Sequence, residues 1–193
     1  NKIITCGEGG MLLTNDLNIA SNAKKFKDLC HSSQKRFIHD GLGFNYRLTN
    51  LQAALGCGEL ENITKYVKIK RKMATTYDRL LSKIPGVRTP VSKSNVKNVF
   101  WMYGIIIDEK TFGINKDALR KILLERGVDT RDFFYPPTDQ PYLKKYLSKN
   151  DKFPNSEFAS KNGLYLPSGL AITQNQIKIV ANHLWDIYNT NRK

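Results

Sequence analysis

The chain has 193 residues, of which 40% are hydrophobic and 25% are charged. This length allows one large domain or two small ones, and the composition is that of an ordinary globular protein, which excludes the disordered and collagen-like classes. The uninterrupted apolar runs are short, whereas a membrane-spanning helix needs about 20 apolar residues. We therefore expect no transmembrane helix and no membrane partner.

Basic residues outnumber acidic ones, with 31 Lys and Arg against 17 Asp and Glu and a formal net charge of +14. Such an excess favours an anionic partner, such as nucleic acid, phosphate groups or an acidic surface. Helical spacing in the one dense basic patch places three lysines on one face, where no aromatic residue is interleaved with them for base stacking, which indicates solvated surface. The patch comprises Lys65, Lys68, Lys70, Arg71 and Lys72.

The cysteines and histidines form no metal-binding or disulfide pattern. Cys6, Cys30 and Cys57 are widely spaced and odd in number, which is typical of a protein in a reducing compartment, so we predict a cytoplasmic location. The three histidines lack the HExxH spacing, and no metal site is expected. No Walker loop, GxSxG elbow or complete GxGxxG motif is present.

Hydrophobic periodicity and helix-capping residues predict the elements of the N-terminal part. A Gly-Gly pair before a short apolar run, and Asn-Asp after it, indicate a strand ended by a turn. The expected elements are a strand at 11–14, a helix capped by Asn18 whose apolar face reaches Cys30, a loop over 31–47, a helix from Thr49 or Asn50 towards Leu60, and a long helix over 63–83 that links two domains.

Beyond Pro90 the pattern changes to short β-rich runs that alternate with helices. This order predicts a small α+β unit with its helices packed on one face of the strands. The expected elements are a strand within 99–107, a helix capped by Asn115 that ends at Gly127, a strand over 128–135, a helix at 156–162, a strand at 164–166, and a last helix that begins with the capping-box pattern Thr173 to Gln176.

The N-terminal segment places Lys2 ahead of a glycine-rich turn, Gly7-Glu8-Gly9-Gly10. Glycines let a backbone approach another group closely, and the amides of such a turn can face an anion. Taken alone, a glycine-rich turn before a strand is more often only a turn, and a lysine is ordinarily solvated.

Four stretches of sequence, including this one, lift the segment above that default. Residues 1–11, Asn-Lys-Ile-Ile-Thr-Cys-Gly-Glu-Gly-Gly-Met, resemble the active-site segment of the DegT/DnrJ/EryC1/StrS sugar aminotransferases. Residues 43–56 are similar to that family's block around Gly-Phe-Asn-Tyr-Arg, and further matches occur at Thr130-Arg131 and at 166–168. The blocks follow the family's order over nearly the whole chain, and the chain most resembles the perosamine synthetases within the family.

The resemblance implies a pyridoxal phosphate (PLP) enzyme that aminates the keto group of a nucleotide-linked deoxysugar, with glutamate as the amino donor. It gives Lys2 two roles, covalent attachment of the cofactor and proton transfer as the base. A free lysine has a pKa of about 10.4, so burial and the charge of the cofactor must keep it neutral for the second role. Asn45 matches the position that reaches across a homodimer to the cofactor phosphate, and the neighbouring Arg47 suits a phosphate or sugar diphosphate.

The resemblance also implies an α/β fold of the fold-type-I PLP transferases, of which this chain is the C-terminal part. We expect residues 1–62 to be the tail of the large PLP-binding domain, 63–90 a linking helix, and 91–193 a small α+β domain. In that family the remaining cofactor contacts precede the lysine. The chain alone is therefore expected to have an incomplete PLP site and to be inactive.

The sequence departs from the family at one position and leaves other readings open. The family usually has a histidine after the Phe134-Tyr135-Pro136 run, where this chain has Pro137 and Thr138, which puts a substrate contact in doubt. A PLP-dependent sugar dehydratase is disfavoured, because the dehydratases of this family have a histidine in place of the lysine, whereas this chain keeps Lys2. The alternatives outside the family are a basic module that binds nucleic acid and an interaction fragment without activity of its own; the resemblance implies no nucleic-acid partner.

Overall fold

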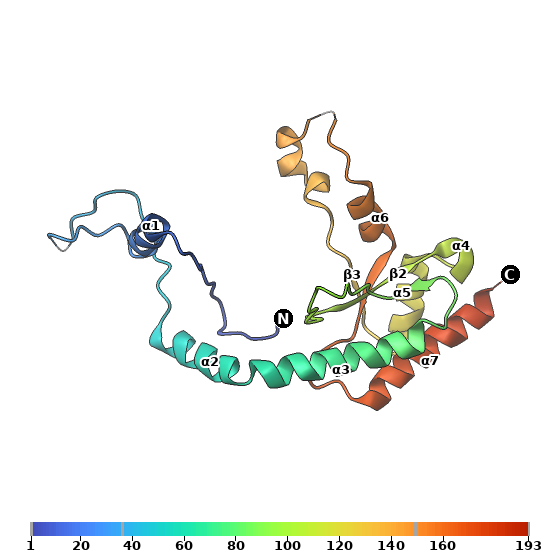
Figure 1. Ribbon diagram of the computed structural model, residues 1–193. Coiled ribbons are helices and arrows are strands. Elements are labelled where there is room, and N and C mark those ends of the chain that lie inside the picture. Colours follow the sequence, from blue (N-terminus) through green and yellow to red (C-terminus); the bar gives the residue numbers. More distant parts are fainter. Residues whose placement is uncertain (1, 36, 149, 193) are drawn as a thin grey trace. The chain divides into compact units, whose positions relative to one another are not determined.

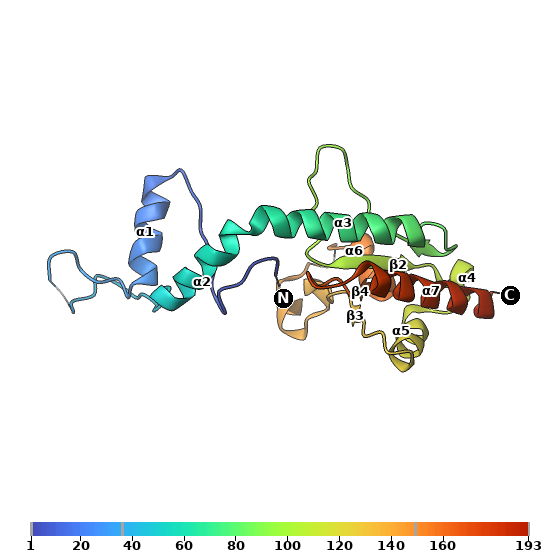
Figure 2. The same ribbon diagram turned by 90° about the horizontal axis from the view of Figure 1, so that it is seen from below.

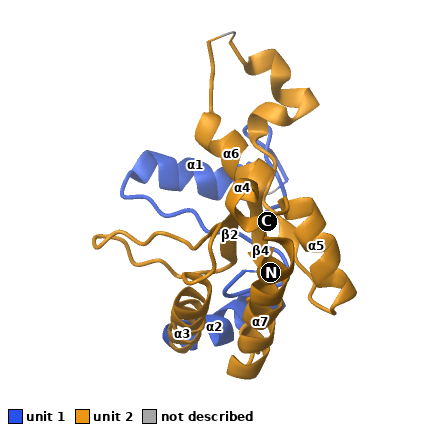
Figure 3. Ribbon diagram, turned by 90° about the vertical axis from the view of Figure 1, so that its right-hand side faces the viewer, with its two compact units in different colours: residues 1–64 blue, residues 65–193 orange. Residues whose placement is uncertain are grey.

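The computed structural model describes residues 2–35, 37–148 and 150–192 (Figure 1). The chain divides into two compact units, residues 1–64 and 65–193, which have different colours in Figure 3. None of the helices in the described ranges is both long and apolar enough to cross a membrane.

The first helix of the N-terminal unit is α1 (Leu17–Lys27), and a carboxylate caps it. Asp16 accepts hydrogen bonds from the main-chain N–H groups of Asn18, at 2.7 Å, and of the residue after it, at 3.1 Å. The cap is Asp16 and not the predicted Asn18, because Asp16 keeps an extended backbone that lets its side chain reach the first unpaired N–H groups. The helix also ends before Cys30, which was predicted to lie on its apolar face.

The second helix, α2 (Asn50–Glu61), is capped by Thr49, one of the two predicted capping residues. The Thr49 hydroxyl accepts from the main-chain N–H of Gln52 at 3.2 Å, and the Gln52 side chain accepts from the N–H of Thr49 at 3.0 Å. This reciprocal pair satisfies two N–H groups that a helix start would otherwise leave unpaired. The capping box therefore determines the residue at which the helix begins.

The predicted strand at residues 11–14 is wrong as a strand. The segment is not paired with any other described segment, and Met11 and Leu13 are 85% and 87% exposed. A strand exists only when its N–H and C=O groups bond to a neighbouring strand. This apolar segment has no such neighbour and is not buried, so neither pairing nor burial stabilises it as a strand. The apolar side chains of this segment therefore form an exposed apolar surface in the first unit.

The second unit is built around a four-stranded antiparallel sheet of order β1-β2-β4-β3. The pairing of β2 with β4 is the longest, with four residue pairs from Tyr103 opposite Leu166 to Ile106 opposite Gly163. The strands are β1 (Val87–Arg88), β2 (Tyr103–Ile107), β3 (Arg131–Asp132) and β4 (Gly163–Leu166).

Helices cover one face of this sheet. Figures 1 and 2 show that α3 and α7 run along the sheet, while α6 lies on the opposite side, against β2 and β4. The predicted capping box at Thr173 is confirmed at the start of α7, and Asn115 caps α5 as predicted. The helical elements are α3 (Ile63–Leu81), α4 (Glu109–Phe112), α5 (Lys116–Glu125), η1 (Pro137–Asp139), η2 (Pro141–Tyr146), α6 (Pro154–Asn162) and α7 (Gln174–Asn191).

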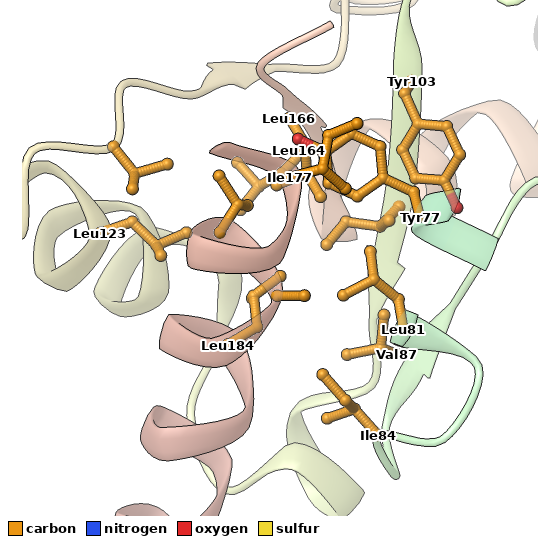
Figure 4. Packing of buried hydrophobic residues seen from close by; sticks show 14 of the residues in the cluster. Tyr77, Leu81, Ile84, Val87, Tyr103, Leu123, Leu164, Leu166, Ile177 and Leu184 are labelled. Atoms are coloured by element: carbon orange, nitrogen blue, oxygen red, sulfur yellow. The ribbon is translucent and has the colours of Figure 1, made fainter. Parts of the chain in front are cut away.

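The core of the second unit lies between the sheet and these helices (Figure 4). Alternate residues of β2 are buried, as expected for a strand with one covered face. Side chains of α3, α5 and α7 meet them, and the C-terminal α+β unit is confirmed. The residues labelled in Figure 4 include Tyr77, Leu81, Tyr103, Leu123, Leu164, Leu166, Ile177 and Leu184, all at most 3% exposed.

Two strands are shorter than predicted. Within the predicted β-rich run 99–107, β2 occupies only Tyr103–Ile107. Phe100 has a φ of +48°, outside the extended region, and its N–H donates to the Asn98 side chain at 2.9 Å. β3 is limited to two residues of the predicted 128–135, which pair with Tyr165 and Leu164 of β4. The α6 helix starts two residues early, at a proline suited to a first turn.

Lys70 in α3 is buried, although the sequence placed it in a solvated basic patch; Lys65, Lys68, Arg71 and Lys72 are exposed. Its side chain is 4% exposed, and its ammonium donates to the main-chain carbonyls of Trp101, at 3.0 Å, and Ser168. These bonds offset part of the cost of burying the charge, and burial lowers the pKa of Lys70 from its ordinary 10.5. Lys70 thereby ties the segments around residues 101 and 168 to α3.

Replacing Lys70 with Met should lower the free energy of unfolding by about 1–3 kcal/mol, because two buried carbonyls lose their donor. The lowered pKa also means that the unfolded chain binds the proton more tightly, so the free energy of unfolding should rise with pH from that lowered pKa towards 10.5. Urea unfolding at several pH values in this range measures the slope of the free energy of unfolding against pH. That slope should be smaller in Lys70→Met than in the unchanged protein. The exposed control Lys68→Met should change stability by less than about 0.5 kcal/mol and keep the slope.

Candidate functional site

The segment that carries Lys2 is tethered to α2 within the first unit. The main-chain N–H of Thr5 donates to the Glu59 carboxylate at 3.3 Å, and the Gln52 amide donates to the main-chain carbonyl of Glu8 at 3.3 Å. Gly7 turns the chain between these bonds with a φ of +85°, a conformation that favours glycine. Lys2 itself is exposed, at the start of this tethered segment.

The predicted loop over 31–47 returns to the C-terminal end of α1 and is bonded to it. The N–H groups of Phe44 and Tyr46 donate to the carbonyls of Phe26, at 2.7 Å, and Lys27, at 2.9 Å. The approach requires Gly43, since an added Cβ there would lie 2.4 Å from the main chain of the residues after α1. The loop therefore holds the intervening Asn45 and the following Arg47 at a defined place beside the helix end.

Asn45 and Arg47 form a small polar cluster with Asp28, the C-cap of α1. The Arg47 Nε donates to the Asn45 amide oxygen at 3.2 Å and lies 3.3 Å from the Asp28 carboxylate. An isolated β-bridge sets Asp28 opposite Asn45, so the main chain itself brings the three side chains together. The structure thus places two of the predicted site residues side by side and adds a third that the sequence did not indicate.

Asn45 and Arg47 of this cluster line a groove of about 1160 Å³ within the first unit. The walls come from residues 8–14, one side of α1, residues 44–48 and Gln52. Lys24 and Lys27 add two cationic side chains to Arg47 along this groove. Lys2 is not among the lining residues, so the groove does not unite all three predicted site residues.

The donor set of the groove fits a phosphate group. The Asn45 oxygen is occupied by Arg47, which leaves its NH₂ group as a donor, and the terminal guanidinium nitrogens of Arg47 are also donors. Phosphate oxygens accept from both groups, and arginine binds them in a forked geometry. The residues of this chain therefore suit the phosphate end of PLP, and the exposed Lys2 amine suits covalent attachment.

The departure from the family pattern lies in the second unit. Pro137 and Thr138 form the start of η1, where the resemblance led us to expect a histidine. The Thr138 hydroxyl is buried and makes no hydrogen bond with the described residues. A hydroxyl cannot supply the second ring nitrogen of an imidazole, so a contact that depends on histidine is absent at this position.

Comparison with known proteins decides the family. Residues 1–185 match the DegT/DnrJ/EryC1/StrS aminotransferase family. The chain belongs to this family. The resemblance found in the sequence is thereby confirmed over almost the whole chain.

Relatives and solved structures agree with this family. The chain is 33% identical to GDP-perosamine synthase of Vibrio cholerae over 98% of its own length and 51% of that protein. It is 30% identical to the putative pyridoxal phosphate-dependent aminotransferase EpsN of Bacillus subtilis, over 98% of this chain and 49% of that protein. Its fold resembles the aminotransferase TlmJ of Streptoalloteichus hindustanus with a TM-score of 0.86 at 23% identity, over 97% of this chain and 50% of that one. The chain therefore spans about half the length of the curated relatives it matches.

The sequence-based prediction did not include Asp28 or the two lysines of the groove among the site residues. Lys24 and Lys27 are three residues apart on α1, a spacing that predicts a shared face but no ligand. The pairing of Asp28 with Arg47 crosses 19 positions and leaves no periodic signal in the sequence. Only the path of the loop brings the two charges together.

Proposed function

We propose that the complete protein is a cytoplasmic PLP-dependent aminotransferase that acts on a nucleotide-linked keto-deoxysugar, with glutamate as the amino donor. The match to GDP-perosamine synthases along 98% of the chain carries this proposal. The family match over residues 1–185 includes the lysine segment and the block of Asn45 and Arg47. The net charge of +14 suits a substrate that bears a diphosphate. We further propose that the product is a 4-amino-4,6-dideoxysugar.

Each of the three site residues has a role that follows from its chemistry. When bound, PLP supplies an electron sink that lets an amino group move between two carbon skeletons. Lys2 attaches the cofactor and, when released from it, moves a proton as the base. Asn45 donates its NH₂ group to the phosphate of the site in the second chain of a homodimer, and Arg47 meets a phosphate or the sugar diphosphate.

The two units correspond to parts of a larger enzyme. Residues 1–62 would complete a large PLP-binding domain, residues 63–90 would link it to residues 91–193, and the latter would form the small domain. The exposure of residues 11–14 supports this, since a larger domain would give their apolar side chains a cover. The relatives' length, about twice that of this chain, leaves room for such a domain.

A substrate panel tests the proposed activity. The complete purified protein, loaded with PLP, is mixed with nucleotide-linked 4-keto-6-deoxysugars that differ in nucleotide, and glutamate consumption is measured with and without each sugar. We expect one amino sugar and one 2-oxoglutarate per glutamate, with a guanosine diphosphate sugar among the accepted substrates. Formation of a deoxygenated keto sugar, with 2-oxoglutarate and free ammonia as the other products and no nitrogen in the sugar, would show a dehydratase instead.

The 193-residue chain alone should bind PLP weakly. Association costs several kcal/mol before any net affinity appears, and this chain would offer only part of the contacts. Absorbance titration of the purified chain should show no stable band from cofactor bound to a lysine. A stable band that Lys2→Ala abolishes would show that these residues form a sufficient site by themselves.

A further inference from the structure

Asp28 stands at a position that helix electrostatics disfavours. It is the C-cap of α1, where the unpaired carbonyls create a partial negative charge that repels a carboxylate. The last turn of α1 follows the ordinary preference with Lys24, Lys25 and Lys27. In a chain with far more basic than acidic residues, a carboxylate at this end needs another reason.

The contacts of Asp28 supply that reason. The backbone bridge sets it opposite Asn45, and Arg47 lies two residues further along, on the same side of an extended segment. The Arg47 Nε faces both the Asp28 carboxylate, at 3.3 Å, and the Asn45 amide oxygen, at 3.2 Å. Asp28 therefore holds the guanidinium in the orientation that binds the oxygen of Asn45.

This orientation decides which end of the Asn45 amide is available. An asparagine amide has an acceptor end and a donor end, and rotation by half a turn exchanges them. With its oxygen turned towards Arg47, the amide has its NH₂ group as the end that can meet a ligand. The terminal nitrogens of Arg47 are donors too, so both Asn45 and Arg47 can donate to a bound anion.

We propose that Asp28 is a positioning residue that acts through Arg47 to fix the donor end of Asn45 towards a phosphate group. The inference rests on the proposed function, because it takes that phosphate to belong to PLP. Asp28 does not touch the phosphate itself; it acts through the ion pair. The side chains of Asp28 and Arg47 are 46% and 52% exposed, and exposed ion pairs contribute little to stability, so the contribution of Asp28 is to orientation.

The test compares PLP with pyridoxal, which lacks the phosphate, in the complete protein freed of cofactor. We expect Asp28→Ala to weaken PLP binding by about tenfold, the lower end of the effect of removing a residue that orients a metal ligand. Pyridoxal binding should be unchanged. Inorganic phosphate should also compete less well against PLP in this variant. Asp28→Glu should restore part of the affinity, because it keeps the carboxylate.

Two controls separate positioning from folding. Asp40→Ala removes an exposed carboxylate from the same loop and should change neither affinity. The unfolding temperature of Asp28→Ala should match that of the unchanged protein. Equal weakening of PLP and pyridoxal binding, or no weakening of either, would overturn the inference alone. If the unchanged protein failed to bind PLP, the proposed function would fall first and the inference with it.

Discussion

Replacing Lys2 with Ala in the complete protein should lower the rate of amino transfer by at least about 10²–10⁴-fold, because a positioned base alone contributes that factor. The same change removes the amine that attaches the cofactor, so the loss is expected at or beyond the upper end. The rate is measured as sugar-dependent formation of 2-oxoglutarate from glutamate. Added methylamine should restore part of the rate, since a free amine can replace the missing base.

The control for Lys2 is a lysine outside the proposed site. Lys83→Ala changes an exposed lysine after α3 and should keep the full rate. Since Lys2 is exposed in the first unit, Lys2→Ala should not change the unfolding temperature of the protein without cofactor. A Lys2→Ala enzyme with near-normal turnover would mean that another lysine carries the chemistry.

Replacing Asn45 with Ala should weaken PLP binding by about ten- to a hundredfold, because a hydrogen bond to a charged phosphate contributes about 1.5–3 kcal/mol. The more informative result comes from mixing this variant with Lys2→Ala. In a homodimer with shared sites, a mixed dimer holds one site with both residues intact and one with neither. Activity should therefore rise on mixing, to a level that neither variant reaches alone.

Subunit exchange must be shown independently in the mixing experiment, for example with two affinity tags. If mixed dimers form and activity does not rise, Asn45 serves its own chain and the shared site is refuted. Asn18→Ala, a change in the first turn of α1 outside the groove, is the matched control and should leave affinity unchanged.

Local patterns predicted most of the helices, and long-range contacts decided what the sequence could not. The capping boxes at Thr49 and Thr173 each lie within four residues, so their helix starts were predicted correctly. The start of β2 was missed because a positive φ at Phe100 follows from its surroundings. The strand expected at residues 11–14 lacks a partner, and periodicity cannot show whether one exists.

The site shows the same division. Asn45 and Arg47 are two residues apart in an extended segment, so their proximity could be predicted from the motif. The addition of Asp28 depends on a loop that returns to α1 and on close packing at Gly43. No residue-type pattern encodes that return, which is why the carboxylate behind the arginine was found only in the structure.

Chemical trapping of the cofactor tests the central proposal most directly. The complete protein is incubated with PLP, reduced with borohydride to make any lysine attachment permanent, digested, and its peptides are weighed. We predict that the pyridoxyl mass lies on Lys2, in the peptide that continues into Gly7-Glu8-Gly9-Gly10. The same mass on a different lysine, or on none, would contradict the assignment of Lys2 as the cofactor-bearing residue.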